Sequence, residues 1–362
     1  MIEAPTRAKA DSPCSKTFGP EAICVLGDVN LKTGKLEGQR VRDVSISGFT
    51  IRGFKQKPNK GEGTIMIDVF GARNATVEGN HVVGNNGAGI GIGAEGLNNT
   101  IENNDLTDNK EAGVSVLQGE RNATVANNTF TGNDRGIFAT DSTETKILSN
   151  DITDNNLGML VEKSTGTKIL SNDISRSGDT GIVIFGPERA NNDAKVVGNN
   201  ISGGAWGMYV GDVTKRGSIA GNTIRNNCAG MFFEADQFDE HVGGFEVRGN
   251  TVEDNTRSCR AAKFDRNVSG VGIALLGAAS GMEVTGNHLS GNVPSGPTRI
   301  SGGVVVSTDP YFKKEQPKPM NNSVIGNHFG HNKPDIFWDE SGSGNSFLGN
   351  LCNTSVPSSL CN

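Results

Sequence analysis

The sequence predicts an all-β solenoid, a stack of about twelve coils built from short parallel strands. Three observations predict it. Only 34% of the 362 residues are hydrophobic while 50 are glycine and 39 are asparagine, a composition that favours repeated turns over two compact cores. A short motif centred on asparagine recurs along nearly the whole chain. A second strand pattern lies between its copies.

The recurring motif has the form apolar-x-x-Asn-x-apolar, as in VEGNHV, IENNDL and ILSNDI. Its asparagines lie 22 to 28 residues apart, except for two spacings of 37 and 40. They are Asn80, Asn104, Asn128, Asn150, Asn172, Asn199, Asn222, Asn250, Asn287, Asn327 and Asn350. An earlier copy, ISGFTI at 46–51, has Phe49 in the asparagine position. Stacked in register at ~4.8 Å, these amides would hydrogen-bond along the stack.

A second strand pattern opens with glycine and continues with apolar residues at alternate positions. It occurs as GIGI (89–92), GVSV (113–116), GIFA (136–139), GMLV (158–161), GIVI (181–184), GMYV (207–210), GMFF (230–233) and GIAL (272–275). A period of two puts one face of each strand inward and the other outward. Short strands in units of roughly 23 residues therefore favour stacked coils around a continuous apolar interior.

With this repeat, the sequence resembles the right-handed parallel β-helix family, in particular its pectate-lyase-like and NosD-like repeat proteins. The resemblance covers residues 41–352. It implies a single-stranded right-handed parallel β-helix of about twelve coils. It leaves the function open, because the family includes polysaccharide lyases, glycosidases, epimerases, tailspikes and non-catalytic proteins. The chain departs from the Arg-rich lyase signature and from the Asp-Pro-His-Glu signature of the uronate epimerases, so neither mechanism transfers directly.

The predicted domain boundaries are an N-terminal cap at 1–40, the β-helix at 41–352 and a C-terminal cap at 353–362. Six cysteines fall in three local pairs, Cys14/Cys24, Cys228/Cys259 and Cys352/Cys361. Six cysteines allow fifteen connectivities, so the pairing is an expectation. Disulfides at the two ends would close the caps that a coil stack needs. They favour a secreted, extracellular protein whose leader is absent from this chain.

Charge and hydropathy exclude two classes of partner. The net charge is −6 and the pI is near 5.5, which disfavours nucleic acid because phosphate binding needs a basic surface. No run of eighteen apolar residues occurs, so no membrane span is predicted. We expect no metal and no cofactor. The five histidines are scattered, no zinc-type spacing occurs, and GAGIGIGAEG precedes a strand rather than a helix.

The outward positions of the strands predict an apolar strip. The alternation puts six apolar side chains on the outward face over about five coils, namely Phe138, Leu160, Val183, Phe185, Tyr209 and Phe232. Such a patch marks a binding site or an interface. A loop that covers the strip, or a contact between subunits of an oligomer, would account for these apolar residues equally well.

Carboxylates border this strip at the ends of the strands. We expect Glu162, Asp212, Glu234 and Asp236 to be the catalytic candidates. Asp212 and Glu234 lie on adjacent coils, and Glu234 and Asp236 lie two residues apart. Both spacings give backbone separations of ~5–7 Å, within the range of carboxylate pairs in glycoside hydrolysis. The alternative is that these are ordinary solvated residues at strand ends.

Three insertions, at 235–243, 256–270 and 308–320, would project near the same strands, where repeat proteins gather binding loops. Surface decoration is the plain alternative. The expected substrate-binding residues are Phe138, Asp141, Leu160, Lys163, Phe185, Tyr209, Lys215, Phe232, His241 and Arg260. Lys163 and Lys215 would neutralise a uronate or an enolate.

These features predict a carbohydrate-active enzyme, a lyase, hydrolase or epimerase, that acts on a polysaccharide in an outward groove. The apolar strip favours a second hypothesis, a cyclase or isomerase of a small apolar natural product. A third is a non-catalytic adhesion or scaffold protein. Convergence of the aromatic strip and the carboxylates on one cavity would support either enzyme.

Overall fold

The computed structural model describes residues 1–3, 21–30, 33–55, 64–186, 191–212, 214–235, 241–261, 266–311 and 316–361. Over these ranges the secondary structure is strand, apart from a short 3-10 helix, η1 (Ser358–Leu360). No helix in the described ranges is long and apolar enough to cross a membrane. The chain divides into two compact units, residues 1–173 (unit 1) and 174–362 (unit 2).

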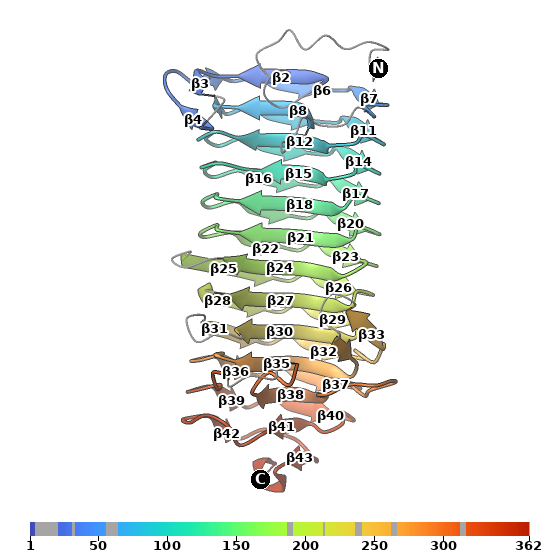
Figure 1. Ribbon diagram of the computed structural model, residues 1–362, viewed down its shortest axis with the longest axis vertical. Coiled ribbons are helices and arrows are strands. Elements are labelled where there is room, and N and C mark those ends of the chain that lie inside the picture. The colour runs from blue at the N-terminus through green and yellow to red at the C-terminus, as the bar shows by residue number, and fades with distance from the viewer. Residues whose placement is uncertain are drawn as a thin grey trace. The chain divides into compact units, whose positions relative to one another are not determined.

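In unit 1 each coil contributes strands to three parallel faces (Figure 1). The first face precedes the ladder asparagine and contains β6 (Ser45–Ser47), β10 (Thr76–Glu78), β13 (Thr100–Glu102), β16 (Thr124–Ala126), β19 (Lys146–Leu148) and β22 (Lys168–Leu170). The second face follows it and contains β1 (Ile2–Glu3), β7 (Thr50–Arg52), β11 (His81–Val83), β14 (Asp105–Thr107), β17 (Thr129–Thr131) and β20 (Asp151–Thr153). The third face contains β2 (Ile23–Leu26), β8 (Ile65–Phe70), β12 (Ala88–Gly93), β15 (Ala112–Val116), β18 (Arg135–Thr140) and β21 (Leu157–Glu162).

Two small pairs and one boundary strand complete unit 1. β3 (Val29–Asn30) and β4 (Lys35–Leu36) form an antiparallel hairpin. β5 (Val41–Arg42) pairs in parallel with β9 (Ala72–Arg73). β23 (Asp173–Ser175) begins at the last residue of the unit.

Unit 2 repeats the three faces. Its first face contains β25 (Asn191–Val197), β28 (Thr214–Ala220), β31 (Val242–Arg248), β36 (Glu283–Thr285), β39 (Ser323–Ile325) and β42 (Ser346–Leu348). Its second face contains β26 (Asn200–Ser202), β29 (Thr223–Arg225), β32 (Thr251–Glu253), β37 (His288–Ser290) and β40 (His328–Gly330). Its third face contains β24 (Thr180–Gly186), β27 (Trp206–Asp212), β30 (Ala229–Ala235), β35 (Val271–Gly277), β38 (Gly302–Ser307), β41 (Ile336–Trp338) and β43 (Ser355–Val356). An antiparallel hairpin, β33 (Cys259–Ala261) and β34 (Arg266–Val268), is added to these faces.

The interior follows the predicted alternation. On the third face of unit 1, Ile67, Ile90 and Val114 lie in register and are completely buried. Ile137 and Met159 continue this inward column. Each coil alone would leave its apolar side chains in water, so burial between neighbouring coils stabilises the stack. The parallel β-helix predicted from the repeat is confirmed.

The predicted asparagine ladder is also present. Asn104 Nδ2 donates to Asn128 Oδ1 at 3.0 Å and to the carbonyl of Val77 at 2.9 Å. Each amide therefore satisfies a turn carbonyl and the next amide, as buried polar groups require. A second ladder, absent from the sequence analysis, follows the second face. It contains Asn85, Asn109, Asn133 and Asn155 in unit 1 and Asn227, Asn255, Asn292 and Asn332 in unit 2.

Two of the expected disulfides are confirmed, Cys228–Cys259 and Cys352–Cys361. Cys24 is disulfide-bonded as well, whereas Cys14 lies outside the described residues. The segments expected as caps both add strands to the third face. β2 pairs with β8, and β43 pairs with β41.

Candidate functional site

The outward side of the third face of unit 1 carries the candidate site. Residues of β8, β12, β15, β18 and β21 lie in register there, and they alternate with the inward column. The outward positions are Asp68, Gly91, Ser115, Phe138 and Leu160. An outward strand position normally faces water. Here an acidic residue, Asp68, and an aromatic residue, Phe138, share one column, with Gly91 and Ser115 between them.

A cavity of about 260 Å³ lies on this outward side. It spans four consecutive strands of the third face, and its walls combine apolar and polar groups. It is lined by Ile65, Phe70, Ala88, Glu111, Ala112, Ser115, Leu117, Gln118, Arg135 and Phe138. A mostly apolar wall with a few convergent polar groups is typical of a small-molecule or sugar site. Its volume is close to the lower end of ligand pockets, roughly 300 Å³.

Arg135 and Phe138 form one side of the cavity. The Arg135 guanidinium carbon lies 5.1 Å from the centre of the Phe138 ring, a cation–π contact. Arg135 Nε is 3.7 Å from an oxygen of the Asp134 carboxylate. That nitrogen is buried and has no hydrogen-bond partner among the described residues. The guanidinium thus lies between the Phe138 ring and the Asp134 carboxylate at the wall of the cavity.

Glu111 supplies a titratable group to the same cavity. Its backbone carbonyl accepts a hydrogen bond from the Arg135 N–H at 3.2 Å, which fixes the two residues together. Burial raises the pKa of the Glu111 carboxyl, the positive charge of Arg135 opposes this change, and the charge of Asp134 adds to it. A carboxyl with a raised pKa keeps its proton closer to neutral pH and can act as a general acid.

Asp68, at the first position of the outward column, forms an acidic pair with Glu21. Asp68 is 1% exposed, and neither of its carboxylate oxygens has a hydrogen-bond partner among the described residues. Burial raises the pKa of Asp68 well above its usual range, and the nearby Glu21 charge raises it further. Burial also raises the pKa of Glu21 to about 7. A Cβ atom on Gly91 would lie only 2.6 Å from Ile65 Cδ1 and 3.4 Å from Asp68 Oδ1, so the glycine makes room for the Ile65 side chain.

The other residues predicted for the site in unit 1 lie one strand further along. Leu160 is in register with Phe138, and Thr140 is in register with Glu162. Thr140 Oγ1 donates to Glu162 Oε1 at 3.0 Å. Asp141 and Lys163 are exposed and take the left-handed backbone conformation, with φ of 51° and 48°. They are turn residues and do not line the cavity.

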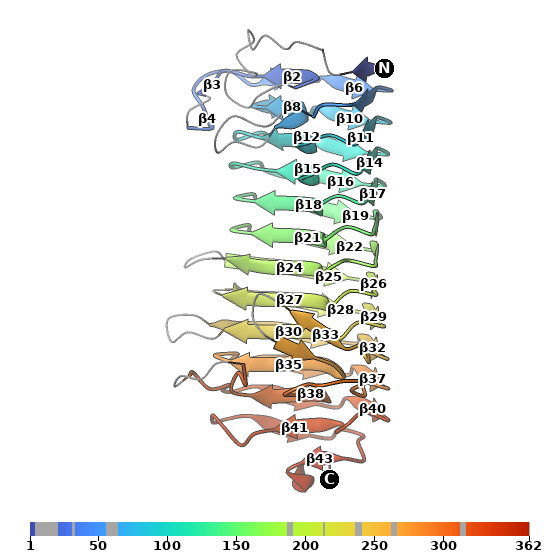
Figure 2. The same cartoon turned by 45° about the vertical axis from the view of Figure 1, so that its right-hand side comes forward.

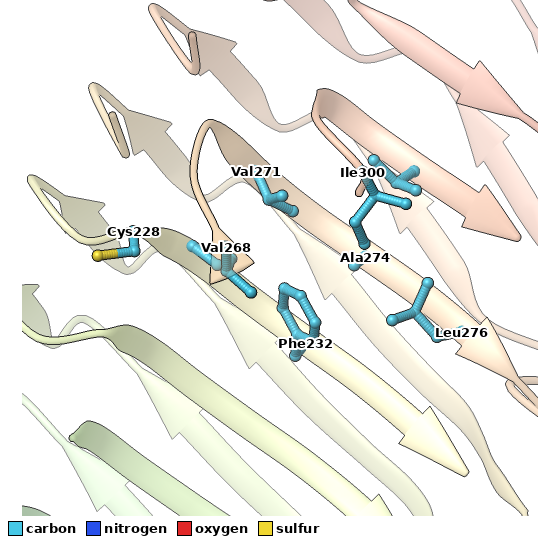
Figure 3. Close-up of a cluster of buried hydrophobic side chains, with 9 residues drawn as sticks. Cys228, Phe232, Val268, Val271, Ala274, Leu276 and Ile300 are labelled. Carbon is cyan, nitrogen blue, oxygen red and sulfur yellow. The ribbon is translucent and has the colours of Figure 1, made fainter. Parts of the chain in front are cut away.

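In unit 2 the chain itself covers one residue of the predicted strip, Phe232. Phe232 is 1% exposed, and its ring contacts Trp206 edge-on at 6.3 Å between centroids. Val268 of the β33–β34 hairpin and Ile300 pack over it, as Figure 3 shows. The Cys228–Cys259 disulfide holds this hairpin against the third face (Figure 2). Phe232 is therefore not a surface residue, and the alternative of a covering loop holds here.

Of the carboxylate side chains predicted as catalytic in unit 2, the structure describes that of Glu234. Glu234 is in register with Gly211 and Leu276, and it is 3% exposed. Gly211, and not Asp212, is thus its backbone neighbour. The Asp212 side chain and all of Asp236 lie outside the described residues. Glu162 belongs to unit 1.

The remaining predicted residues of unit 2 are spread over its surface. Phe185 and Tyr209 are half-buried, and Tyr209 lies in register between Val183 and Phe232. Lys215 and Arg260 are exposed. Burial lowers the pKa of His241, and the positive charge of Lys215 lowers it further.

Sequence analysis missed Arg135 and Glu111, which line the cavity with Phe138, and the acidic pair of Asp68 and Glu21. Asp68 had a signal, because it interrupts the otherwise apolar run Ile65–Phe70 on an outward position. Arg135 had one too, since it opens the strand that carries Phe138. Asp68 is found when the column of outward positions is extended by one strand, to the strand Ile65–Phe70 that precedes GIGI (89–92). Glu111 and Glu21 lie outside regular strands.

Two family models match the chain. One, described as the right-handed beta helix region, matches residues 135–329. The other, described as the periplasmic copper-binding protein NosD, matches residues 47–192. No curated protein matches the chain.

Solved structures with the same fold show low identity. The surface adhesin PfbA of Streptococcus pneumoniae matches at 13% identity and a TM-score of 0.55, over 83% of this chain and 77% of the adhesin. The catalytic unit of a thermostable α-1,3-glucanase from Streptomyces thermodiastaticus matches at 14% identity and a TM-score of 0.55, over 87% of this chain and 57% of the glucanase chain. A variant of a periplasmic alginate epimerase matches at 12% identity and a TM-score of 0.51, over 85% of this chain and 77% of the epimerase.

The residues of the stretch that matches the copper-binding description do not fit a copper ion. Its one histidine, His81, contacts Asp105 Oδ2 through Nδ1 at 2.9 Å. Its two methionines, Met66 and Met159, are buried in the core, and it contains no cysteine. Within the described ranges, no group of three or more His, Cys, Asp or Glu side chains is placed to hold a metal.

Proposed function

The chain belongs to the right-handed β-helix family, and on that premise we propose that it is a carbohydrate-active enzyme whose sugar site is the cavity of unit 1. One observation carries this proposal. The Phe138 ring, the Arg135 guanidinium and a Glu111 carboxyl of raised pKa surround the same space. An aromatic face, a fixed cation and a proton donor are what proton transfer on a bound sugar requires.

Each residue has a role in this proposal. Phe138, which is half-buried, offers its aromatic ring to the apolar face of a sugar. Arg135 donates hydrogen bonds to sugar oxygens while Phe138 holds its plane. Glu111 gives or takes the proton at the reacting carbon or oxygen, and burial keeps its carboxyl protonated at higher pH than an exposed glutamate.

The fold supports a carbohydrate substrate without deciding the reaction. The solved structures of this fold include a glucanase and an epimerase as well as an adhesin, and at such identity they share only the architecture with this chain. Hydrolysis, elimination and epimerisation all need a positioned acid or base, which Glu111 supplies. The disulfides Cys228–Cys259 and Cys352–Cys361 suit an oxidising, extracytoplasmic compartment.

The test is a panel of neutral and uronate-containing polysaccharides incubated with the full chain. New reducing ends, unsaturated products and changes in sugar configuration are measured separately. We expect one class to be converted, and Glu111→Gln to lower turnover by about 10²–10⁴-fold while binding persists. Glu102→Gln is the matched control, because Glu102 lies on the first face of the same unit. Binding without conversion by the native chain would exclude the catalytic role and leave glycan recognition.

A further inference from the structure

Two exposed histidines lie side by side on the second face of unit 2. His288 of β37 and His328 of β40 are in register although 40 residues separate them in the chain. Their Nδ1 atoms are 2.9 Å apart and their ring centroids are 5.0 Å apart. The ring planes are inclined by 28°. Both side chains are exposed, so the pair is open to solvent.

The two nitrogens share one hydrogen bond in this arrangement. One ring donates through Nδ1–H and the other accepts, since two donors or two acceptors at 2.9 Å would repel. Imidazole nitrogens bind first-row metal ions at about 2.0–2.1 Å. Two such nitrogens in adjacent positions at a right angle are separated by roughly 2.9 Å. The separation of the histidine nitrogens therefore matches that of two neighbouring ligands of one ion.

We propose that His288 and His328 bind a divalent first-row transition-metal ion through their Nδ1 atoms. The ion replaces the shared proton, and each exposed ring turns so that its lone pair faces the ion. Neutral imidazole suits copper, nickel and zinc among these ions. No third His, Cys, Asp or Glu is placed to complete the set within the described ranges. Water or an added ligand takes the remaining positions, which makes the site open.

The corresponding position in unit 1 provides an internal comparison. His81 follows its ladder asparagine as His288 and His328 do, and it is in register with Asp105. Its Nδ1 contacts Asp105 Oδ2 at 2.9 Å, and the Thr107 hydroxyl donates to the other Asp105 oxygen at 2.7 Å. His81 is thus paired with a carboxylate that is already hydrogen-bonded. It lacks a second imidazole in register.

The strand position of His288 and His328 is occupied by threonine in the preceding coil, so threonine is a substitution that keeps the fold. Thr251 of β32 pairs with His288 on the other side. Threonine at 288 or 328 therefore adopts the strand that its neighbour already forms, and threonine favours strands. The variants His288→Thr and His328→Thr remove one ligand each, and His81→Thr is the matched control.

The experiment titrates the tag-free full chain with Cu²⁺, which binds nitrogen ligands most tightly among these ions. Calorimetry gives the affinity and stoichiometry, and electron paramagnetic resonance shows whether two nitrogens couple to the copper. We expect one ion per chain with two coupled nitrogens. We expect His288→Thr and His328→Thr each to weaken binding more than about tenfold, whereas His81→Thr leaves it unchanged.

Three outcomes would overturn the proposal. The native chain binds no Cu²⁺, or the His288→Thr and His328→Thr variants bind it as the native chain does, or the resonance shows no coupling to two nitrogens. Circular dichroism of each variant confirms the strand content before titration. The polysaccharide assay is run with and without EDTA, so a failure of the metal site and a failure of the sugar site are distinguished.

Discussion

Asn99 Nδ2 donates a hydrogen bond to Glu120 Oε1 at 2.9 Å inside a turn of unit 1. Glu120 is completely buried, and its other oxygen has no hydrogen-bond partner among the described residues. Burial raises the pKa of Glu120 to about 8, although the Asn99 hydrogen bond and the charges of Arg40 and Arg121 oppose the change. A carboxyl at the centre of a turn thus remains neutral at physiological pH.

This carboxyl makes the stability of unit 1 depend on pH. Its pKa rises from an ordinary 4.5 to about 8 on folding. Its favourable contribution is complete below pH 4.5 and is lost as the pH rises through 8. The shift corresponds to about 5 kcal/mol at most. We expect Glu120→Gln to unfold at a higher temperature than the native chain at pH 9 and at a similar temperature at pH 4, followed by circular dichroism.

Glu144→Gln is the control for this prediction, because Glu144 is exposed in a corresponding turn. It should change neither melting temperature. Parallel curves of melting temperature against pH for Glu120→Gln and the native chain would show that Glu120 is already ionised in the folded state.

Interrupting the predicted asparagine ladder, to which Asn104 and Asn128 belong, should lower the free energy of unfolding. Asn128 Oδ1 accepts from the backbone and side chain of Asn104, at 2.9 and 3.0 Å. Asn128 Nδ2 donates to the Ile101 carbonyl and to Asn150 Oδ1. Asn128→Ala leaves several of these buried groups without partners, each at about 1–3 kcal/mol. We expect a loss of about 3 kcal/mol or more in urea unfolding.

An exposed asparagine, Asn122, provides the control for the buried ladder. Asn122 is also bonded to a neighbouring amide, Asn98, at 2.8 Å, but the pair is exposed to water. Its φ is 55°, so glycine rather than alanine is the substitution that preserves the turn. Asn122→Gly should cost less than about 1 kcal/mol. Equal losses for Asn122→Gly and Asn128→Ala would mean that burial of the ladder is energetically unimportant.

The coil stack could be predicted from the sequence because its determinants are local. Each motif contains its own turn, its asparagine and its inward residue, as Asn104 and Leu106 illustrate. The parallel register then follows from repetition. The second ladder was missed because its asparagines, such as Asn109, lie outside the apolar-x-x-Asn motif. Its members nevertheless repeat at the same spacing of 24 or 22 residues.

The site could be predicted only in part because exposure is not local. Alternation correctly puts Phe138 and Phe232 on the outward side of their strands. Phe138 lines a cavity, whereas Phe232 is covered by segments that follow it by more than 30 residues. The contact between His288 and His328, by contrast, follows from the register of the coils, because each histidine comes directly after its ladder asparagine.

The Cys228–Cys259 disulfide should control the cover over Phe232. It closes a loop of 31 residues, for which chain entropy gives about 3–4 kcal/mol. Replacing both cysteines with serine should lower the stability of unit 2 by this order. The hairpin would then leave the Phe232 ring, and Trp206 would become more accessible. Acrylamide quenching of tryptophan fluorescence measures the change.

The second described disulfide serves as its control. Cys352–Cys361 closes a loop of only 9 residues near the C-terminus. Its double serine variant should leave the quenching of Trp206 as in the native chain. Trp206 and Trp338 are the two tryptophans of the chain. Both measurements are therefore repeated in a Trp338→Phe background, in which the tryptophan fluorescence comes from Trp206 alone. Unchanged quenching without Cys228–Cys259 would show that packing alone holds the hairpin.

Two neighbours of Glu111 should move its pKa in opposite directions. The Arg135 charge lowers the pKa of Glu111, and the Asp134 charge raises it. Arg135→Gln should therefore raise that pKa, and Asp134→Asn should lower it. Carbon-13 NMR of labelled glutamate follows the carboxyl directly, with Glu111→Gln assigning the signal. If Glu111 acts as the general acid, the pH at which turnover is lost moves upward in Arg135→Gln and downward in Asp134→Asn. A shift of the same sign in both variants would rule out the charge arrangement around the cavity as the cause.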